Sequence, residues 1–184
     1  MAGYGKVQGG HEICALHTML VVGKVDLRLK GLREFAKQIR DAKYVTKVGF
    51  FPQAKYADGK QVAYIAYLNE YGDHNPPRPF MKRTAEKRQN AWTKLFGYTL
   101  KTEGVSGQSI YRAHKKVGIV AEGDIKKTIH EWSPTDPRPN KPATIRRKAK
   151  RARGGKNLVP INPETVLIDS GVMISSVTSE VYKA

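Results

Sequence analysis

NEYGDHNPPRPFM, residues 69–81, joins two segments whose apolar patterns both predict helices, and it therefore controls how those helices meet. Three of the four residues 76–79 are proline, and each proline fixes φ and removes a backbone donor. An extended, stiff segment of this kind loses little entropy when it is ordered against a partner. We expect Arg78 to project outward and Phe80 with Met81 to form an apolar plug that docks on another molecule. The alternative is an abrupt corner between two helices of the same chain.

The segment before this stretch predicts a short helix. Residues 62–71, VAYIAYLNEY, are apolar nearly all round, which indicates a helix buried between two layers. Asp58 and Gln61 have the three-residue spacing of a capping box, and Gly72 supplies the residue type that ends helices.

The segments after it predict two long helices. Residues 82–100 and 109–132 each carry apolar side chains at helical spacing, and the Gly/Ser-rich residues 104–107 break the pattern between them. The sequence therefore predicts two amphipathic helices that face a common core.

Shorter segments predict strands around these helices. KVDLRLK (24–30) alternates apolar and polar residues, and YVTKVGFFP (44–52) is strand-like until Pro52. Residues 32–42 between them have helical spacing, and residues 177–181 alternate after a turn at Ser170-Gly171. Helices and strands in this order predict an α+β fold.

Charge is concentrated in one part of the chain. The 184 residues hold 33 Lys and Arg against 16 Asp and Glu, a net charge of +17 with a pI near 10.0, which favours a polyanionic partner. Residues 138–156 carry nine bases and no acid. The nine are Arg138, Lys141, Arg146, Arg147, Lys148, Lys150, Arg151, Arg153 and Lys156.

Three environments suit this basic segment. It could neutralise phosphates of a nucleic-acid duplex, pair with an acidic protein surface, or remain a solvated loop. Tyr182 is the only aromatic residue or histidine between Ser133 and Lys183, which argues against base stacking. The composition divides the chain into a Gly-rich arm (1–11), a body (12–132), a Pro-rich and basic insertion (133–157) and a C-terminal strand that returns to the body (158–184).

The sequence contains no pattern that indicates catalysis. A nucleophile elbow, a phosphate-binding loop, a dinucleotide fingerprint and a metal-ligand spacing are all missing, so we expect neither an enzyme nor a metal or cofactor. A nuclease would need clustered carboxylates, and Asp58, Asp73 and Asp136 show no such spacing. The single cysteine, Cys14, is expected to be a buried thiol in an apolar run too short to span a bilayer.

Residues 45–184 carry five motifs in an order that resembles the tail-completion and neck proteins of tailed bacteriophages. They are a Val-Gly strand before an Ala54, Tyr56, Asp58, Gly59 turn; a helix with Val62, Ala63, Ile65, Ala66, Asn69, Glu70, Tyr71 and Gly72; PPRPFM (76–81); PATIRRK (142–148); and a closing element with Leu167, Ile168, Asp169, Ser170, Gly171, Met173 and Ser176.

The resemblance implies a non-enzymatic virion protein at the head–tail junction or the top of the tail, made in the host cytoplasm and without membrane contact. Its fold would be a small antiparallel sheet packed with two long helices and one short buried helix. Its partners would be further copies in a ring, often a hexamer, around the DNA channel, together with connector or adaptor, tail-tube and tail-terminator proteins. The nine bases would face the genome or an acidic partner. A freestanding, sequence-independent DNA-binding protein is the alternative.

In such a ring the proline-rich stretch would be the contact between subunits. The expected assembly residues are Asn69, Glu70, Pro76, Pro77, Arg78, Pro79, Phe80 and Met81.

Overall fold

The structure is a computed structural model that describes residues 30–73, 75–132, 138–154 and 162–183. Its elements are α1 (Lys30–Ala42), β1 (Tyr44–Phe50), α2 (Val62–Tyr71), α3 (Phe80–Glu103), α4 (Gly107–Glu131), α5 (Pro142–Arg153), α6 (Val172–Ser175) and β2 (Val177–Lys183). The two strands form an antiparallel sheet among several helices, which confirms the predicted α+β class. The predicted arm 1–11, strand 24–30 and buried Cys14 lie outside the described residues, apart from Lys30, which begins α1.

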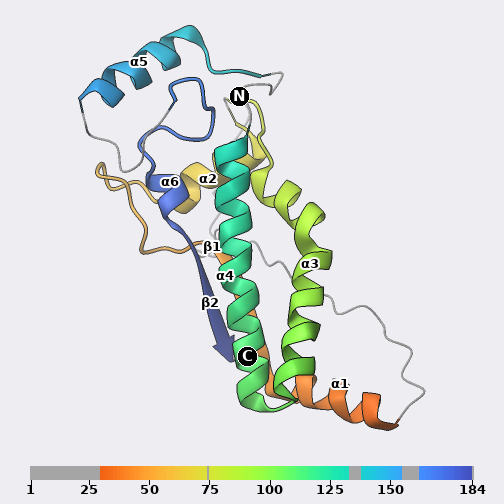
Figure 1. Cartoon of the computed structure of the whole chain (residues 1–184). Coiled ribbons are helices and arrows are strands. Elements are labelled where there is room, and N and C mark those ends of the chain that lie inside the picture. The colour runs from red at the N-terminus through yellow and green to blue at the C-terminus, as the bar shows by residue number, and fades with distance from the viewer. Residues whose placement is uncertain (1–29, 74, 133–137, 155–161, 184) are drawn as a thin grey trace, which may run out of the picture.

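The two long helices form an antiparallel hairpin along the length of the molecule (Figure 1). Trp92, Phe96 and Leu100 of α3 are buried against Val117 and Ala121 of α4. All of them except Leu100 belong to the predicted apolar stripes, so the helical periodicity identified the correct inner faces.

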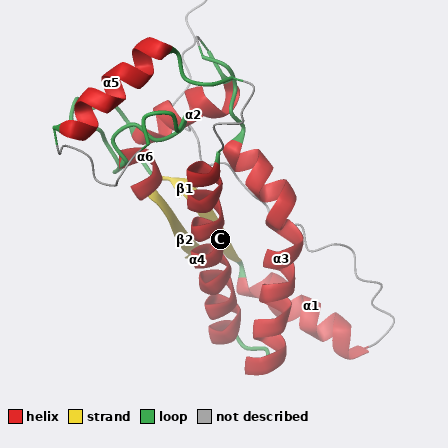
Figure 2. Cartoon of the chain, turned by 45° about the horizontal axis from the view of Figure 1, so that its top comes forward, coloured by secondary structure: helices red, strands yellow, loops and turns green. Residues whose placement is uncertain are grey.

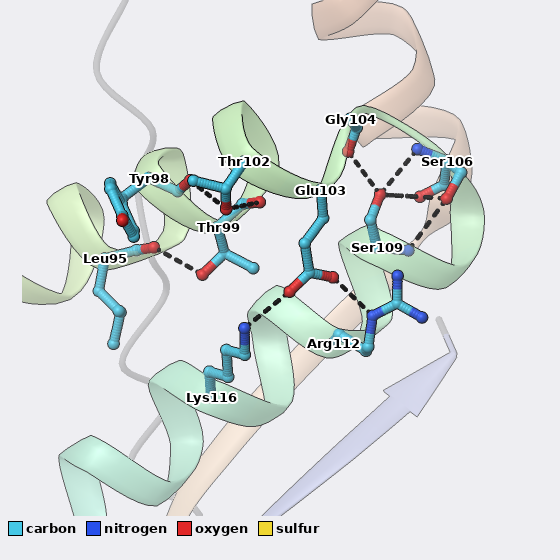
Figure 3. Close-up of polar contacts among 10 residues, drawn as sticks. All are labelled: Leu95, Tyr98, Thr99, Thr102, Glu103, Gly104, Ser106, Ser109, Arg112 and Lys116. Carbon is cyan, nitrogen blue, oxygen red and sulfur yellow. Dashed lines mark hydrogen bonds and ion pairs between the residues drawn. The ribbon is translucent and has the colours of Figure 1, made fainter.

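The turn between these helices is closed by hydrogen bonds (Figure 3). Ser106 is the N-cap of α4, and its Oγ accepts from the backbone N–H of Ser109 at 3.1 Å, while Ser109 Oγ accepts from the Ser106 N–H at 2.8 Å. Glu103 pairs with Lys116 at 2.7 Å and Arg112 at 2.6 Å. These two bases of α4, Lys116 first, lower the pKa of the Glu103 carboxyl.

The sheet lies against α4. Tyr44 is opposite Lys183 and Phe50 is opposite Val177 in the ladder. A Cβ added to Gly118 of α4 would lie 2.7 Å from Ser179 Oγ, so only glycine lets the helix approach β2 this closely.

A second core fills the end of the molecule where α2, the start of α3 and the end of α4 meet residues 166–177. Val62, Phe80 and Ile129 are fully buried there. The Phe80 and Phe50 rings pack edge to face, with their centres 6.2 Å apart. Phe80 and Met81 are therefore core residues of their own chain. The prediction that they form an exposed docking plug was wrong.

α2 differs from its prediction in two ways. Tyr64, Tyr67 and Tyr71 are 49%, 42% and 53% exposed, so one face of the helix is open and the helix is not enclosed on all sides. The capping box is absent as well. Gln61 is the N-cap and makes no side-chain cap, while Asp58 accepts from the backbone N–H of Lys60 at 3.2 Å and closes a separate turn.

The C-terminal turn contains a short helix that the sequence did not predict. Gly171, at φ 86°, is the N-cap of the four-residue α6, and β2 follows it directly. The turned view in Figure 2 shows α5, α6 and α2 gathered at one end of the molecule and α1 at the other.

Candidate functional site

The proline-rich stretch forms a tight corner between α2 and α3. Gly72 ends α2 at φ 77°, and a Cβ at this position would lie 2.8 Å from the Asn75 carbonyl oxygen. The Arg78 N–H then donates to the Asn69 carbonyl at 2.6 Å, which ties the second arm of the corner to the first. The stretch therefore closes on its own chain, as the alternative interpretation proposed.

The Glu70 side chain caps α3 across this corner. One carboxylate oxygen accepts from the Met81 N–H and the other from the Lys82 N–H, each at 2.9 Å. Pro79, the N-cap of α3 by position, offers no side-chain acceptor. Because Glu70 is only 3% exposed, desolvation raises the pKa of its carboxyl, and the backbone donors at Lys82 and Met81 oppose that rise.

Few of the expected assembly residues are available to a partner. Glu70, Arg78, Phe80 and Met81 are buried, and only Pro76 and Pro77 are exposed. The interface prediction rests on the low entropy cost of ordering a stiff, proline-rich segment against a partner. The buried side chains of the stretch also contact residues farther away in the sequence, Phe50 and Arg138 among them.

α5 separates its bases onto two faces. It begins with Pro142 in the first turn, where the missing N–H costs nothing, and it contains six bases and no acid. Four of these bases lie on the exposed side of the helix, which we call the basic face: Arg146, Arg147, Lys150 and Arg153. The i, i+1, i+4, i+7 spacing places all four on one side of a helix, and Figure 1 shows α5 at an extremity of the molecule.

Lys148, on the opposite side, anchors α5 to the body. It is 2% exposed, and its Nζ donates to the carbonyl oxygens of Thr165 at 2.6 Å and Ile168 at 2.5 Å. Burial lowers the pKa of this lysine to about 8, although the nearby Asp169 acts in the opposite direction. The prediction that Lys148 faces DNA or an acidic partner was wrong, because its ammonium group is used inside the protein.

Two further contacts hold the same anchor. Arg151 pairs with Asp169, and Asn140 Nδ2 lies 3.2 Å from the Thr165 carbonyl oxygen. The basic segment is therefore attached to residues 165–169 through three side chains, and it folds partly as a helix. The parts of the predicted insertion at 133–137 and 155–157 lie outside the described residues.

Arg78 connects the corner to this anchor. It was expected to project outward, but it is 7% exposed and its Nη2 donates to the Arg138 carbonyl at 3.2 Å. Its charge is close enough to Lys148 to lower the pKa of that lysine. PPRPFM, PATIRRK and the Leu-Ile-Asp element, far apart in the sequence, thus meet at one place.

The other three bases predicted to face DNA or an acidic partner lie before α5 or outside the described residues. Arg138 and Lys141 are exposed on the approach to the helix, and Lys156 is outside the described residues. Among the described residues, no three His, Cys, Asp or Glu side chains are grouped to hold a metal ion. In the same ranges, no helix is both long and apolar enough to cross a membrane.

Comparison of the chain with known protein families, with curated proteins and with solved structures found no significant match.

Proposed function

We propose that this chain is a structural protein of a tailed-phage virion, at the head–tail junction or the top of the tail, where copies form a ring around the DNA channel. The proposal begins from the resemblance of residues 45–184 to neck and tail-completion proteins. The family's hexameric ring and its connector, adaptor, tail-tube and tail-terminator partners belong to the same proposal.

The observation that carries the proposal is the basic face of α5. A helix with four exposed bases on one side presents a row of positive charge that phosphates can neutralise. Lys148 and Arg151, on the other side, fix the orientation of the helix against the body. A row of charge held in a fixed orientation is what a surface that faces a polyanion needs. A solvated loop would not need a fixed orientation.

The way the motifs come together is consistent with a structural role. Glu70, Arg78, Lys148 and Asp169 belong to separate motifs, and each contributes to capping, closing or anchoring an element. These four motif residues therefore support the fold itself. This is what a protein that acts by shape and assembly requires.

The experiment that tests the proposal is mass photometry of the purified chain, with and without a short DNA duplex. A discrete ring, or a monomer that closes into rings when DNA is present, is the expected result. A monomer that coats DNA without assembling would instead favour the freestanding DNA-binding protein. A chain that neither assembles nor binds DNA would overturn both functions.

A further inference from the structure

The two-stranded sheet is incomplete in the part of the chain that the structure describes. β1 and β2 pair with each other, and each has a second edge that no described strand occupies. An open edge presents unpaired N–H and C=O groups to any extended segment. The sheet can therefore accept another strand.

One face of this sheet is also partly open. Thr46 and Ser179 point toward α4, so their neighbours in the alternation point to the opposite face. Val45 and Tyr182 are paired there and are 36% and 39% exposed, and Lys47 Nζ lies 5.1 Å from the centre of the Tyr182 ring. An added strand with one apolar side would extend such a surface.

Residues 24–29 have the pattern of that strand, and they lie outside the described residues. Val25, Leu27 and Leu29 alternate with the charged Lys24, Asp26 and Arg28. One apolar side and one charged side are typical of a strand that covers a core on one face and meets water on the other.

Chain connectivity disfavours pairing of this segment with the sheet of its own chain. It directly precedes Lys30, and the 13 residues of α1 separate Lys30 from the sheet. At a rise of about 1.5 Å per residue, α1 separates Lys30 from Ala42, two residues before β1, by roughly 18 Å. Ile39 and Ala42, near the end of α1, pack on the core, and both views show α1 leading away from the sheet (Figures 1 and 2). A paired strand must stay about 5 Å from its neighbour along its whole length.

We propose that residues 24–29 of one copy add as a strand to the open edge of the sheet in a second copy. This inference rests on the proposed self-assembly and names one of its contacts. The donor segment and the acceptor edge are different parts of each chain, separated by α1. The contact is therefore head-to-tail, and repeated contacts of that kind close into a ring when the rotation allows it.

Two variants of the full chain test the exchange. Leu27→Asp places a carboxylate on the apolar side of the segment, and Arg28→Asp places the same group on the charged side. We expect sedimentation velocity to show at least a tenfold weaker association for Leu27→Asp and wild-type association for Arg28→Asp. Arg28→Asp changes the charge of the chain more than Leu27→Asp does, so a purely electrostatic effect would shift the association of the control more than that of the test variant.

The other outcomes separate this inference from the proposed function. If Leu27→Asp assembles like the wild type, strand exchange is overturned while a ring built on other surfaces still stands. Circular dichroism of the same sample reports folding. If Leu27→Asp loses helical signal together with assembly, the segment packs within its own chain and the inference fails. A wild-type chain that stays monomeric with and without DNA would remove the ring and the exchange together.

Discussion

At the scale of single residues, Glu70 shows how a charged side chain within an apolar helix can serve the next helix. Its carboxylate accepts two N–H groups at the start of α3 that the prolines before it leave without a cap. A glutamine has the same size, but its NH₂ group would face one of those two donors. We expect Glu70→Gln to lower the free energy of unfolding by about 1–3 kcal/mol, because one buried N–H loses its acceptor. Urea denaturation measures the change.

Glu86 supplies the matched control for that substitution. It lies in α3, and it is exposed, at 3.9 Å from Lys82. Glu86→Gln should change the free energy of unfolding by no more than about 0.5 kcal/mol, because exposed ion pairs contribute little to stability. Equal effects of the two variants would show that Glu70 does not cap α3.

Lys148 gives the protein a characteristic dependence on pH. Its pKa is about 8 in the folded chain and close to 10.5 when the chain is unfolded, because burial disfavours the charged form. Between these values the unfolded chain holds the extra proton, so the free energy of unfolding rises with pH. From pH 8 to 9.5 we expect a gain of roughly 1–2 kcal/mol from this group.

Two lysine substitutions isolate that gain. Lys148→Met removes the titrating group and should flatten the rise, whereas Lys150→Met, at an exposed position of the same helix, should keep it. The measurement is the difference in unfolding free energy between each variant and the wild type at several pH values. Asp169, Arg78, Arg147 and Arg151 influence this lysine and are present in every sample. A Lys148→Met curve parallel to the wild type would contradict a buried, titrating lysine.

At the scale of elements, the approach of α4 to the sheet depends on one glycine. Gly118→Ala would place a Cβ 3.0 Å from Ser179 Cβ and 3.2 Å from Thr46 Cγ2, so the helix and the sheet must move apart. We expect a loss of about 1–3 kcal/mol from overpacking. Gly123 of the same helix has nothing within 4 Å of the place where a Cβ would lie. Gly123→Ala should therefore raise the free energy of unfolding by up to about 1 kcal/mol, because alanine favours the helix. Thermal denaturation should show melting temperatures that shift in opposite directions.

Local pattern was enough to predict the elements that bury one continuous stripe. The apolar spacing in residues 82–100 and 109–132 predicted α3 and α4, and the strand-like composition of residues 44–52 predicted β1. α2 was misread because three tyrosines count as apolar in a pattern, although their rings can lie exposed at the surface. The short α6 could not be predicted, because its four residues are too few to show a helical period.

The candidate site was less predictable, because its contacts are long-range. Residues 138–156 were recognisable as a basic segment, but nothing local distinguishes buried Lys148 from exposed Lys150. The difference arises from the carbonyl oxygens of Thr165 and Ile168, contributed by a segment about twenty residues away. No helix was predicted here, although the six bases have helical spacing, and a helix that packs on a body must turn one side inward.

At the scale of the whole molecule, the basic face and the proposed strand contact involve different parts of the chain. Figure 1 shows α5 at one end and the start of α1 at the other. A copy could therefore bind a neighbour through the sheet and the segment before α1 while its basic face remains free. DNA binding and self-assembly should then be separable by substitution.

That separation leads to a prediction about salt. Each phosphate neutralised on a duplex contributes about −0.9 to the slope of log K against log salt concentration. Replacing the four bases of the basic face by glutamine should therefore reduce the slope by up to about 3–4, while Lys148 and Arg151 keep α5 in place. Fluorescence anisotropy of a labelled duplex between low and moderate salt measures the slope, and sedimentation velocity should show unchanged assembly.

A matched variant removes the same charge from a different surface of the protein. Its four glutamines replace exposed lysines of α3 and α4: Lys87, Lys94, Lys101 and Lys115. If phosphate contact is concentrated on α5, this control should keep most of the wild-type slope, because distant charges are screened within about 10 Å at ordinary ionic strength. Equal losses in both variants would mean that DNA responds to overall charge and that α5 is not a dedicated contact. If the slope of the α5 variant equals that of the wild type, the basic face contacts an acidic protein surface and not phosphates.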